Sequence, residues 1–383
     1  MIVLLSMDVK NFGLTFDDVL LQPGYAGFFR SNISVKTKLT AKISLDVPLV
    51  SSPMDTVTES KLAIALAQCG GLGFIHRNLT IPAQAKEVAK VKRLGLRVGA
   101  AVGSSSGYNE RVKNLVNAGV DVILVDSAHG YSKQVIGTVK NIKKKYPKLP
   151  VIAGNVATYE GAKALIDTGA DGLRVGMGPG AICSTRIVSG MGVPQLTAIK
   201  NVVRAASKRK IPVIADGGIR FSGDITKALA AGASTVMLGK IFAASSEAPG
   251  KAITLKPNEV PSRFRSLING AKIYTFKQYR GMGSLAAMKE GIAVSSEDEF
   301  HGKNYTADQL IAEGVEGLVP CTGPLANTVR QLMGGLHSGM YYTGAKSIAE
   351  LWKKAKFLQI TDASLNESYP HSLFVTESGG NLG

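Results

Sequence analysis

A glycine-rich segment near the middle of the chain contains the cysteine best suited to nucleophilic chemistry. Cys183 comes shortly after Gly176, Gly178 and Gly180, in the stretch GMGPGAICSTR. A loop of this composition carries few side chains, so its backbone groups can face a ligand or an ion. Two hydroxyl side chains and Arg186 directly follow the cysteine, and such a setting favours the reactive thiolate. We therefore predict that Cys183 acts as a nucleophile. The alternative, that it only packs as a small buried apolar residue, is less favoured.

The other cysteines and two histidines give weaker signals. Cys69 precedes a pair of glycines that is typical of a helix end, so we interpret it as a packing residue, whereas the role of Cys321 stays open. Three cysteines are too few for a disulfide framework and no two have zinc-ligand spacing, which indicates a reducing compartment. His76 and His129 could be catalytic or structural, and their spacing does not separate these alternatives.

A second group of candidate residues follows a later apolar run. The segment ADGGIR places the carboxylate of Asp216 directly before the bare backbone amides of Gly217 and Gly218. A carboxylate suits the diol of a ribose, and glycine amides suit a phosphate. Gly239 follows the next apolar run and could complete the same phosphate cup. We therefore favour a ribose and phosphate site over the alternative, a turn with a structural aspartate.

Composition limits the partners that such a site could serve. The 383 residues are 45% hydrophobic and include 45 Lys and Arg against 28 Asp and Glu, a net charge of +17, which excludes disordered, collagenous and disulfide-scaffold classes. The positive charge would attract a polyanion, but the lysines fall mostly in amphipathic helical stretches such as 140–148, without a zinc-finger or RNA-reading pattern. A small anionic substrate fits the charge equally well, so nucleic acid is not expected as the primary partner.

Nothing in the sequence predicts a membrane segment. No uncharged apolar run approaches the roughly 18 residues that would indicate a transmembrane helix. No basic region precedes the apolar residues at the start of the chain. We expect a soluble cytoplasmic protein without a membrane partner.

Eight short apolar runs recur along the chain, each followed by a polar or glycine turn and, in most cases, a segment of helical periodicity. The runs are continuously apolar, which is typical of parallel strands buried on both faces, and several helices end at glycine before the next strand. These units predict an α/β protein with a (β/α)8 barrel, also called a TIM barrel, with a doubly wound open sheet as the alternative. The expected strands are 47–54, 71–77, 96–102, 121–126, 150–155, 172–176, 211–216 and 235–239, and the expected helices are 59–68, 82–93, 109–118, 133–145, 159–168, 196–208 and 223–230.

The barrel interpretation places the functional residues just after the strands, at their C-terminal ends. The long remainder of the chain is expected to form an insertion on the same face, with a mobile flap at approximately 285–317 and a last helix near 348–357. Residues 1–383 would then form a single catalytic domain.

These residues and the motifs around them resemble the IMP dehydrogenase and GMP reductase family over nearly the whole chain. The fold of that family is the (β/α)8 barrel. Many of its dehydrogenases carry a pair of regulatory CBS modules between the second helix and the third strand, whereas here KVKRLGLRVG at 90–99 runs straight through, so no CBS domain is expected at 93–96. The motifs that carry the resemblance are GLTFDDVLLQPGY at 13–25, SSPMDTVTE at 51–59, GFIHRN at 73–78, VDSAHG at 125–130, GNVAT at 154–158, GMGPGAICSTRIVSGMGVPQ at 176–195, IADGGIR at 214–220, YRGMGS at 279–284, AEGVEGLVP at 312–320 and the tail 333–371.

The resemblance implies a role for each residue of a nucleotide site. Cys183 would add to C2 of the purine, and the adduct would expel hydride or ammonia. Potassium would be bound by the carbonyls of Gly178, Gly180 and Cys183, helped by a neighbouring subunit's tail near Glu367 in a homotetramer. The implied contacts are Asp126, Ser127 and Asn155 for the cofactor, and Ser52, Met54, Asp216, Gly217, Gly218, Gly239, Lys240, Tyr279, Met282 and Gly283 for the substrate.

The sequence also departs from the family pattern. Ala181 replaces a serine of the phosphate site, and Lys240, which replaces another serine, could restore a donor there. In the dehydrogenases a flap Arg-Tyr pair activates water; counted back from Glu313, that pair falls on 299–300, which reads Glu-Phe here. Thr185 and Glu313 match the threonine-glutamate pair that serves proton transfer in the reductases and acts as a slower base in the dehydrogenases.

These features leave two directions of reaction open. The stretch IVSGMGVPQ and the long flap favour an IMP dehydrogenase, which oxidises IMP to XMP with NAD in guanine nucleotide biosynthesis. The missing Arg-Tyr pair and the retained Thr185 and Glu313 favour a GMP reductase, which uses NADPH. We predict the dehydrogenase first and the reductase as the alternative, with a weakly active nucleotide- or nucleic-acid-binding paralogue as a further alternative.

Overall fold

The computed structural model describes residues 12–294 and 310–373, and its centre is a closed barrel of eight parallel strands. Around the barrel the strands follow the order β10-β11-β4-β5-β6-β7-β8-β9, so the last barrel strand along the chain pairs with the first. The predicted (β/α)8 barrel is confirmed, and the open-sheet alternative is wrong because β11 pairs with β4. The barrel strands are β4 (Leu49–Ser51), β5 (Leu72–Ile75), β6 (Gly99–Val102), β7 (Val122–Asp126), β8 (Val151–Val156), β9 (Gly172–Val175), β10 (Val213–Asp216) and β11 (Thr235–Leu238).

Helices between consecutive strands surround the barrel, close to the expected ranges. Glycines with positive φ end four of them, at Gly70, Gly119, Gly169 and Gly232, because a left-handed residue reverses the chain toward the next strand. The predicted helices correspond to α1 (Ser60–Gln68), α2 (Ile81–Lys92), α3 (Tyr108–Asn117), α4 (Lys133–Lys145), α5 (Tyr159–Asp167), α7 (Gln195–Ala206) and α8 (Ser222–Ala230).

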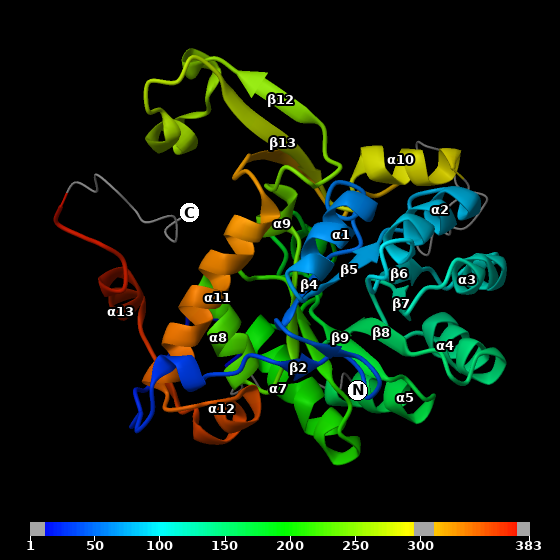
Figure 1. Cartoon of the computed structure of the whole chain (residues 1–383), viewed down its shortest axis with the longest axis horizontal. Coiled ribbons are helices and arrows are strands. Elements are labelled where there is room, and N and C mark those ends of the chain that lie inside the picture. The colour runs from blue at the N-terminus through cyan, green and yellow to red at the C-terminus, as the bar shows by residue number, and fades with distance from the viewer. Residues whose placement is uncertain (1–11, 295–309, 374–383) are drawn as a thin grey trace, which may run out of the picture.

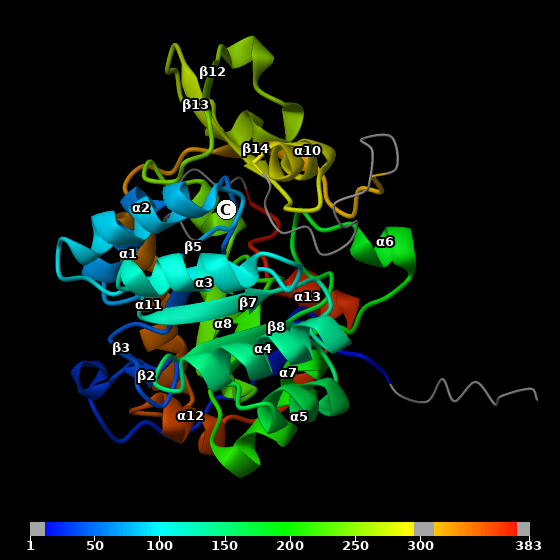
Figure 2. The same cartoon turned by 90° about the vertical axis from the view of Figure 1, so that its right-hand side faces the viewer.

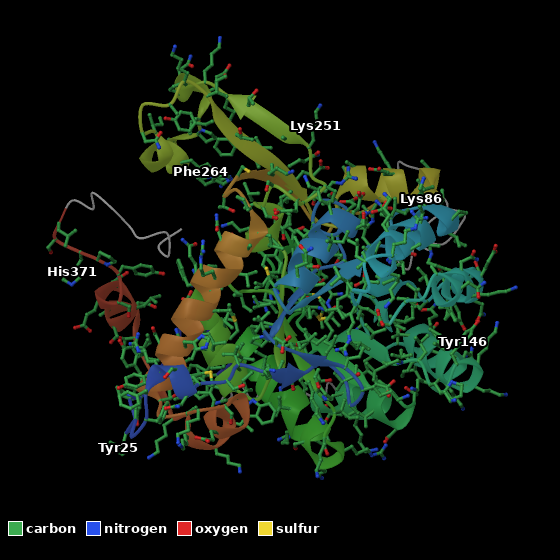
Figure 3. All side chains as sticks on the ribbon, in the orientation of Figure 1. Tyr25, Lys86, Tyr146, Lys251, Phe264 and His371 are labelled. Carbon is green, nitrogen blue, oxygen red and sulfur yellow. The ribbon has the colours of Figure 1, made fainter. Side chains whose placement is uncertain are left out.

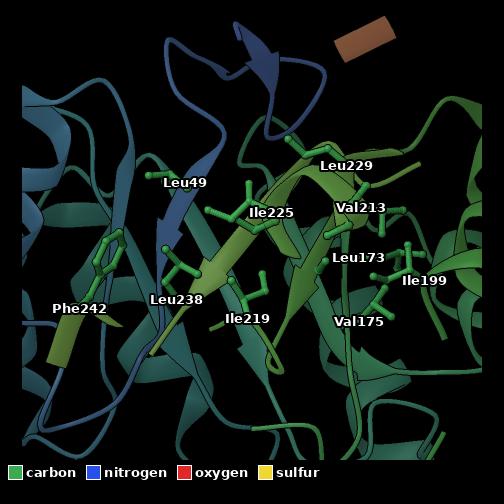
Figure 4. Packing of buried hydrophobic residues seen from close by; sticks show 14 of the residues in the cluster. Leu49, Leu173, Val175, Ile199, Val213, Ile219, Ile225, Leu229, Leu238 and Phe242 are labelled. Atoms are coloured by element: carbon green, nitrogen blue, oxygen red, sulfur yellow. The ribbon is translucent and has the colours of Figure 1, made fainter. Parts of the chain in front are cut away.

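Each barrel strand buries side chains on both faces, which explains the continuously apolar runs. Residues of one face fill the space between barrel and helices, where Leu173 and Val213 lie near Ile199 and Leu229 (Figure 4). Residues of the other face form a second cluster inside the barrel, to which Val122 and Leu124 of β7 belong.

A short hairpin closes the end of the barrel opposite the functional loops. It consists of β2 (Thr37–Lys38) and β3 (Ser44–Leu45), which pair antiparallel. Leu39, Ile43 and Leu45 from this hairpin are buried in the cluster inside the barrel. Ligands therefore reach the barrel from its other end, where the strands finish.

The segment after β11 contains a three-stranded antiparallel sheet that the sequence analysis did not predict. Its strands are β12 (Ala252–Leu255), β13 (Tyr274–Arg280) and β14 (Glu316–Pro320), and the β12–β13 part projects away from the barrel in Figure 1. Phe264, labelled in Figure 3, packs on Phe276 of β13 with ring centroids 5.6 Å apart. Of the expected flap, α10 (Leu285–Ala293) and residues 310–317 are described, whereas Glu299 and Phe300 lie outside the described residues.

The eighth barrel helix, α11 (Leu325–Tyr342), was also not predicted. It packs against α8 and α1, so it closes the ring of helices (Figure 1). The expected last helix at 348–357 is shorter, α12 (Ile348–Lys354), because Phe357 begins strand β15 (Phe357–Gln359), which pairs with β1 (Val19–Leu21). A further short helix, α13 (Asp362–Glu367), follows.

Candidate active site

A cavity of about 520 Å³ opens where the barrel strands end, and it gathers nearly all of the residues that the sequence analysis selected. Glu367 is the exception, because it ends α13 at the surface and does not line this cavity. The predicted residues that line it are Ser52, Met54, Asp126, Ser127, Asn155, Gly178, Gly180, Cys183, Thr185, Asp216, Gly217, Gly218, Gly239, Lys240, Tyr279, Met282, Gly283 and Glu313.

Cys183 is an exposed, free thiol in the loop between β9 and the short helix α6 (Thr185–Ser189), which stands out from the barrel in Figure 2. Its Sγ donates to Oγ1 of Thr185 at 3.1 Å. The loop therefore presents a sulfur to the cavity with a hydroxyl group in direct contact. Cys69, by contrast, is half-buried against the core, and burial raises the pKa of its thiol, in agreement with the predicted packing role.

Glu313 is held against the cysteine loop by its backbone. Its carbonyl accepts from the amide of Ser184 at 2.9 Å and lies 3.8 Å from Sγ of Cys183, while its own amide donates to the carbonyl of Gly283 at 3.0 Å. Two residues further on, the amide of Val315 donates to the carbonyl of Ile182 at 3.0 Å. The segment that precedes β14 thus lies between the cysteine loop and Gly283, which brings together three parts of the predicted site.

Arg186 does not act on the thiol as the sequence suggested. Its Nε donates to the carbonyl of Met177 at 3.0 Å and its Nη2 to that of Val193 at 2.7 Å. Its guanidinium therefore joins the start of the cysteine loop to the segment after α6. A Cβ at position 178 would lie 2.5 Å from Cγ of Arg186, which explains the glycine there, at φ +77°.

A buried arginine that the sequence analysis missed organises the floor of the cavity. Arg174 on β9 donates from Nε to Oδ2 of Asp216 at 3.0 Å and also binds Asp126. Burial alone would lower the pKa of Arg174, but the charges of Asp216 and Asp126 raise it, so the guanidinium stays protonated. Asn155 donates to the same Oδ2 of Asp216 at 3.1 Å. The expected ribose carboxylate and the expected cofactor residues therefore belong to one network.

The predicted phosphate cup is a concave site around Gly239. A Cβ at this position would lie 2.9 Å from Oη of Tyr279, 3.3 Å from Oγ of Ser52 and 3.4 Å from Sδ of Met54. Burial, followed by the charges of Asp216 and Cys183, raises the pKa of Tyr279, so its hydroxyl stays a neutral donor. The side chain of Lys240 is exposed and lines the cavity directly after this glycine.

The glycines after β10 allow a second close approach. Gly217 has φ +90°, and a Cβ there would lie 2.8 Å from Cγ of Pro179 and 3.2 Å from the amide of Gly180. The loop after β10 thus packs on the cysteine loop. Gln195, another buried residue that the sequence analysis missed, donates from Nε2 to the carbonyls of Val175 and Asp216 and joins the ends of β9 and β10.

An ion pair anchors the end of β13 to the loop after β4. Arg280 donates to Asp55 from Nε at 3.1 Å and from Nη2 at 2.7 Å, and Asn78 donates to the same carboxylate at 2.9 Å. Tyr279 and Met282 flank this arginine in sequence and line the cavity. The pair therefore fixes the segment that carries both residues.

The histidines stay outside this chemistry. His76 is buried, with Nε2 3.5 Å from Oε1 of Glu59, and His129 is exposed; neither lines the cavity. Within the described residues no three His, Cys, Asp or Glu side chains are grouped to hold a metal ion. Nor does that part of the chain contain a helix long and apolar enough to span a membrane.

The closed parallel barrel, with a cavity at the C-terminal ends of its strands and a free cysteine in the wall of that cavity, defines a (β/α)8-barrel enzyme. Sequence comparisons identify the family. A model of the IMP dehydrogenase / GMP reductase domain matches residues 13–371, and the chain belongs to this family. The resemblance seen in the motifs is thereby confirmed.

Three relatives illustrate the similarity. Inosine-5'-monophosphate dehydrogenase of Borreliella burgdorferi is 44% identical over 411 aligned residues, which cover 94% of this chain and 97% of the relative. The enzyme of the same name from Cryptosporidium parvum is 44% identical over 416 residues, covering 97% of this chain and 98% of the relative. That from Haemophilus influenzae is 38% identical over 504 residues, covering 98% of this chain and 99% of the relative.

Proposed function

We propose that this protein oxidises IMP to XMP with reduction of NAD through a covalent adduct on Cys183. The observation that carries the proposal is the position of the cysteine. Its sulfur faces a cavity also lined by Asp216 and the concave site at Gly239, which suit the ribose and the phosphate of a nucleoside monophosphate. The relatives named inosine-5'-monophosphate dehydrogenase align over almost the whole chain, which favours this reaction over GMP reduction.

The chemistry follows from the thiolate. Sγ of Cys183 adds to C2 of the purine, and C2 then loses its hydrogen as hydride, which leaves a thioimidate bound to the sulfur. NAD, bound beside C2, would supply the nicotinamide ring as the acceptor of this hydride. Water adds to C2, the C–S bond breaks, and XMP leaves. The balance is IMP, NAD⁺ and water giving XMP, NADH and one proton.

Hydrolysis of the thioimidate needs a base for the water molecule. Thr185 contacts the sulfur directly, and Glu313 is fixed beside the same loop, so we assign them to proton transfer from water. Asp126, Ser127 and Asn155 would hold the nicotinamide half of NAD near C2.

Substrate recognition would be divided around the cavity. Asp216 would bind the ribose hydroxyls, and Met54, Met282 and Gly283 would contact the base. The phosphate would lie against hydrogen-bond donors that converge at one end of the site. There the neutral Tyr279 hydroxyl and the Lys240 ammonium would replace the hydroxyl donor that is lost with Ala181. The remaining phosphate contacts would be Ser52, Gly217, Gly218 and Gly239.

Potassium and assembly form a linked part of the proposal. The carbonyls of Gly178, Gly180 and Cys183 belong to one tight loop, and such oxygens are suitable ligands for potassium. Glu367 would approach this loop from a neighbouring subunit, since it does not line the cavity of its own chain. The protein would then be a homotetramer.

We also propose that residues 1–383 form a single catalytic domain with a flap at approximately 285–317, of which 295–309 lie outside the described residues, and no CBS domain at 93–96. The short connection between Lys92, at the end of α2, and Gly99, at the start of β6, supports the latter. A cytoplasmic location agrees with the free thiols of all three cysteines.

The proposal is tested by parallel assays of IMP with NAD and of GMP with NADPH. We expect NADH formation at 340 nm and XMP as the product in the first assay only. Oxidation of NADPH in the second assay without turnover in the first would make the protein a GMP reductase. Absence of turnover in both would favour a binding paralogue.

A further inference from the structure

Arg77 is a mostly buried cation of the cavity wall that the proposed function leaves unused. It follows β5, lines the cavity, and has a side chain only 15% exposed to solvent. Its Nε is buried and has no hydrogen-bond partner. A guanidinium withdrawn from water requires acceptors, because an unpaired buried charge is costly.

Asp126, the nearest anion, does not satisfy Arg77. The Nε of Arg77 lies 3.8 Å from Oδ2 of Asp126, too far for a hydrogen bond. The other oxygen of Asp126 is bound by Arg174. Asp126 therefore offsets the charge of Arg77 without filling its hydrogen-bonding capacity.

The other arginines of the cavity wall are committed to protein acceptors. Arg174 binds Asp126 and Asp216, Arg186 binds two carbonyls, and Arg220 binds Asp17. Within the described residues, no hydrogen bond joins Arg77 or Lys240 to a protein acceptor. The cavity thus has two cations with donors to spare: Lys240 beside Gly239 after β11, and Arg77 beside Asp126.

The reaction brings two anionic groups into the cavity, the phosphate of IMP and the diphosphate of NAD. Lys240 adjoins the proposed phosphate site, whereas Arg77 adjoins Asp126, on the proposed cofactor side. We propose that Arg77 binds the diphosphate of the dinucleotide, an inference that rests on the proposed use of NAD. A guanidinium suits this role because its planar donors can bind two phosphate oxygens at once.

Binding of ADP-ribose to the IMP-saturated protein tests this assignment without turnover. ADP-ribose keeps the diphosphate and lacks the nicotinamide that Asp126 would face, so its affinity separates a diphosphate contact from a shift of Asp126. We expect Arg77→Gln to weaken ADP-ribose binding by calorimetry about ten- to a hundredfold, with the IMP affinity unchanged. Arg77→Lys should recover part of the loss, and the loss should shrink as salt concentration rises.

Arg93→Gln is the matched control, since this exposed arginine ends α2 at the opposite end of the barrel and should leave both affinities unchanged. Thermal unfolding of each variant establishes that it is folded. Equal ADP-ribose affinity in Arg77→Gln and the unaltered protein would overturn this inference alone. Failure of the unaltered protein to bind either NAD or ADP-ribose would overturn the NAD assignment and this inference with it.

Discussion

Arg174 on β9 bridges the carboxylates of Asp126 and Asp216, which end β7 and β10. The Arg174 side chain is 9% exposed, so this pairing takes place largely away from water. Removal of the guanidinium would leave two carboxylates close together without the cation that joins them, although Arg77 lies near Asp126. Arg174 therefore links the proposed cofactor side of the cavity to the proposed ribose side.

We expect Arg174→Met to destabilise the fold by about 3–5 kcal/mol, the usual cost of breaking a buried ion pair by removing one partner. Denaturation in urea measures the loss. Lys163→Met, which removes an exposed partner of Asp167, is the control and should have a much smaller effect. Equal stability of Arg174→Met and the unaltered protein would show that the bridge is not needed for folding.

Asp224 in α8 makes stability depend on pH. Burial raises the pKa of its carboxyl above the ordinary value of 3.8. The hydrogen bonds that the carboxylate accepts from the backbone amides of Arg220 and Phe221 lower the pKa, but by less. Because the folded state holds this proton more tightly than the unfolded state, its contribution to stability is full below pH 3.8 and is lost as pH rises through the raised pKa. Asp224→Asn, which keeps an acceptor and no charge, should therefore gain stability relative to the unaltered protein between pH 4 and 7.

Urea denaturation of both proteins across this range measures the difference. A constant difference in unfolding free energy from pH 4 to 7 would contradict the expectation, and so would a difference that falls with rising pH.

Gly239→Ala should block the proposed phosphate site. The added methyl group would lie 2.9 Å from Oη of Tyr279 and fill the space where the phosphate enters. We expect weaker binding of IMP and a much smaller change for inosine, measured by equilibrium dialysis. Gly223→Ala is the matched control, because a Cβ at that position of α8 meets nothing within 4 Å. A parallel loss for both ligands would indicate a general distortion of the cavity.

Glu313→Gln should separate the two halves of the reaction. Hydride transfer does not use the base, so a pre-steady-state burst of NADH should persist, whereas steady turnover should fall by about 100- to 10,000-fold. Stopped-flow absorbance at 340 nm follows both phases. Glu110→Gln, at an exposed carboxylate of α3, should behave like the unaltered protein. Normal steady turnover of Glu313→Gln would remove this residue from the chemistry.

The barrel could be predicted from the sequence because its determinants are local. Strands buried on both faces are continuous apolar runs, and a glycine such as Gly169 marks the end of the preceding helix. Helix α11 also carries a local signal, because apolar residues at helical spacing form its buried face, namely Leu325, Val329, Leu332 and Leu336. It was missed because three glycines interrupt it and a long insertion separates it from β11.

The inserted sheet had no comparable signal. Strand β12 has four residues, only partly buried, and pairs with β13 across an intervening segment, so its stability comes from contacts that no local pattern encodes.

The residues that line the cavity could be selected from the sequence where they belong to motifs that follow strands, and not where a side chain acts through distant partners. Arg174 lies inside a buried apolar strand, and Asp126 and Asp216 are 48 and 42 residues away. Arg280 meets Asp55 across 225 residues. Such pairs depend on which distant segments the folded chain brings together, and no local sequence pattern encodes that.

The central claim is that Cys183 carries the purine during oxidation, and mass spectrometry of the quenched reaction tests it most directly. Protein mixed with IMP and NAD is quenched in acid within the first turnover and digested. The mass of the peptide that contains Cys183 is then measured. We predict a thioimidate adduct on Cys183, increased in Glu313→Gln because hydrolysis is slowed, and absent in Cys183→Ala although this variant still binds IMP. NADH formation by Cys183→Ala, or an adduct on Cys69 or Cys321 instead, would contradict the account.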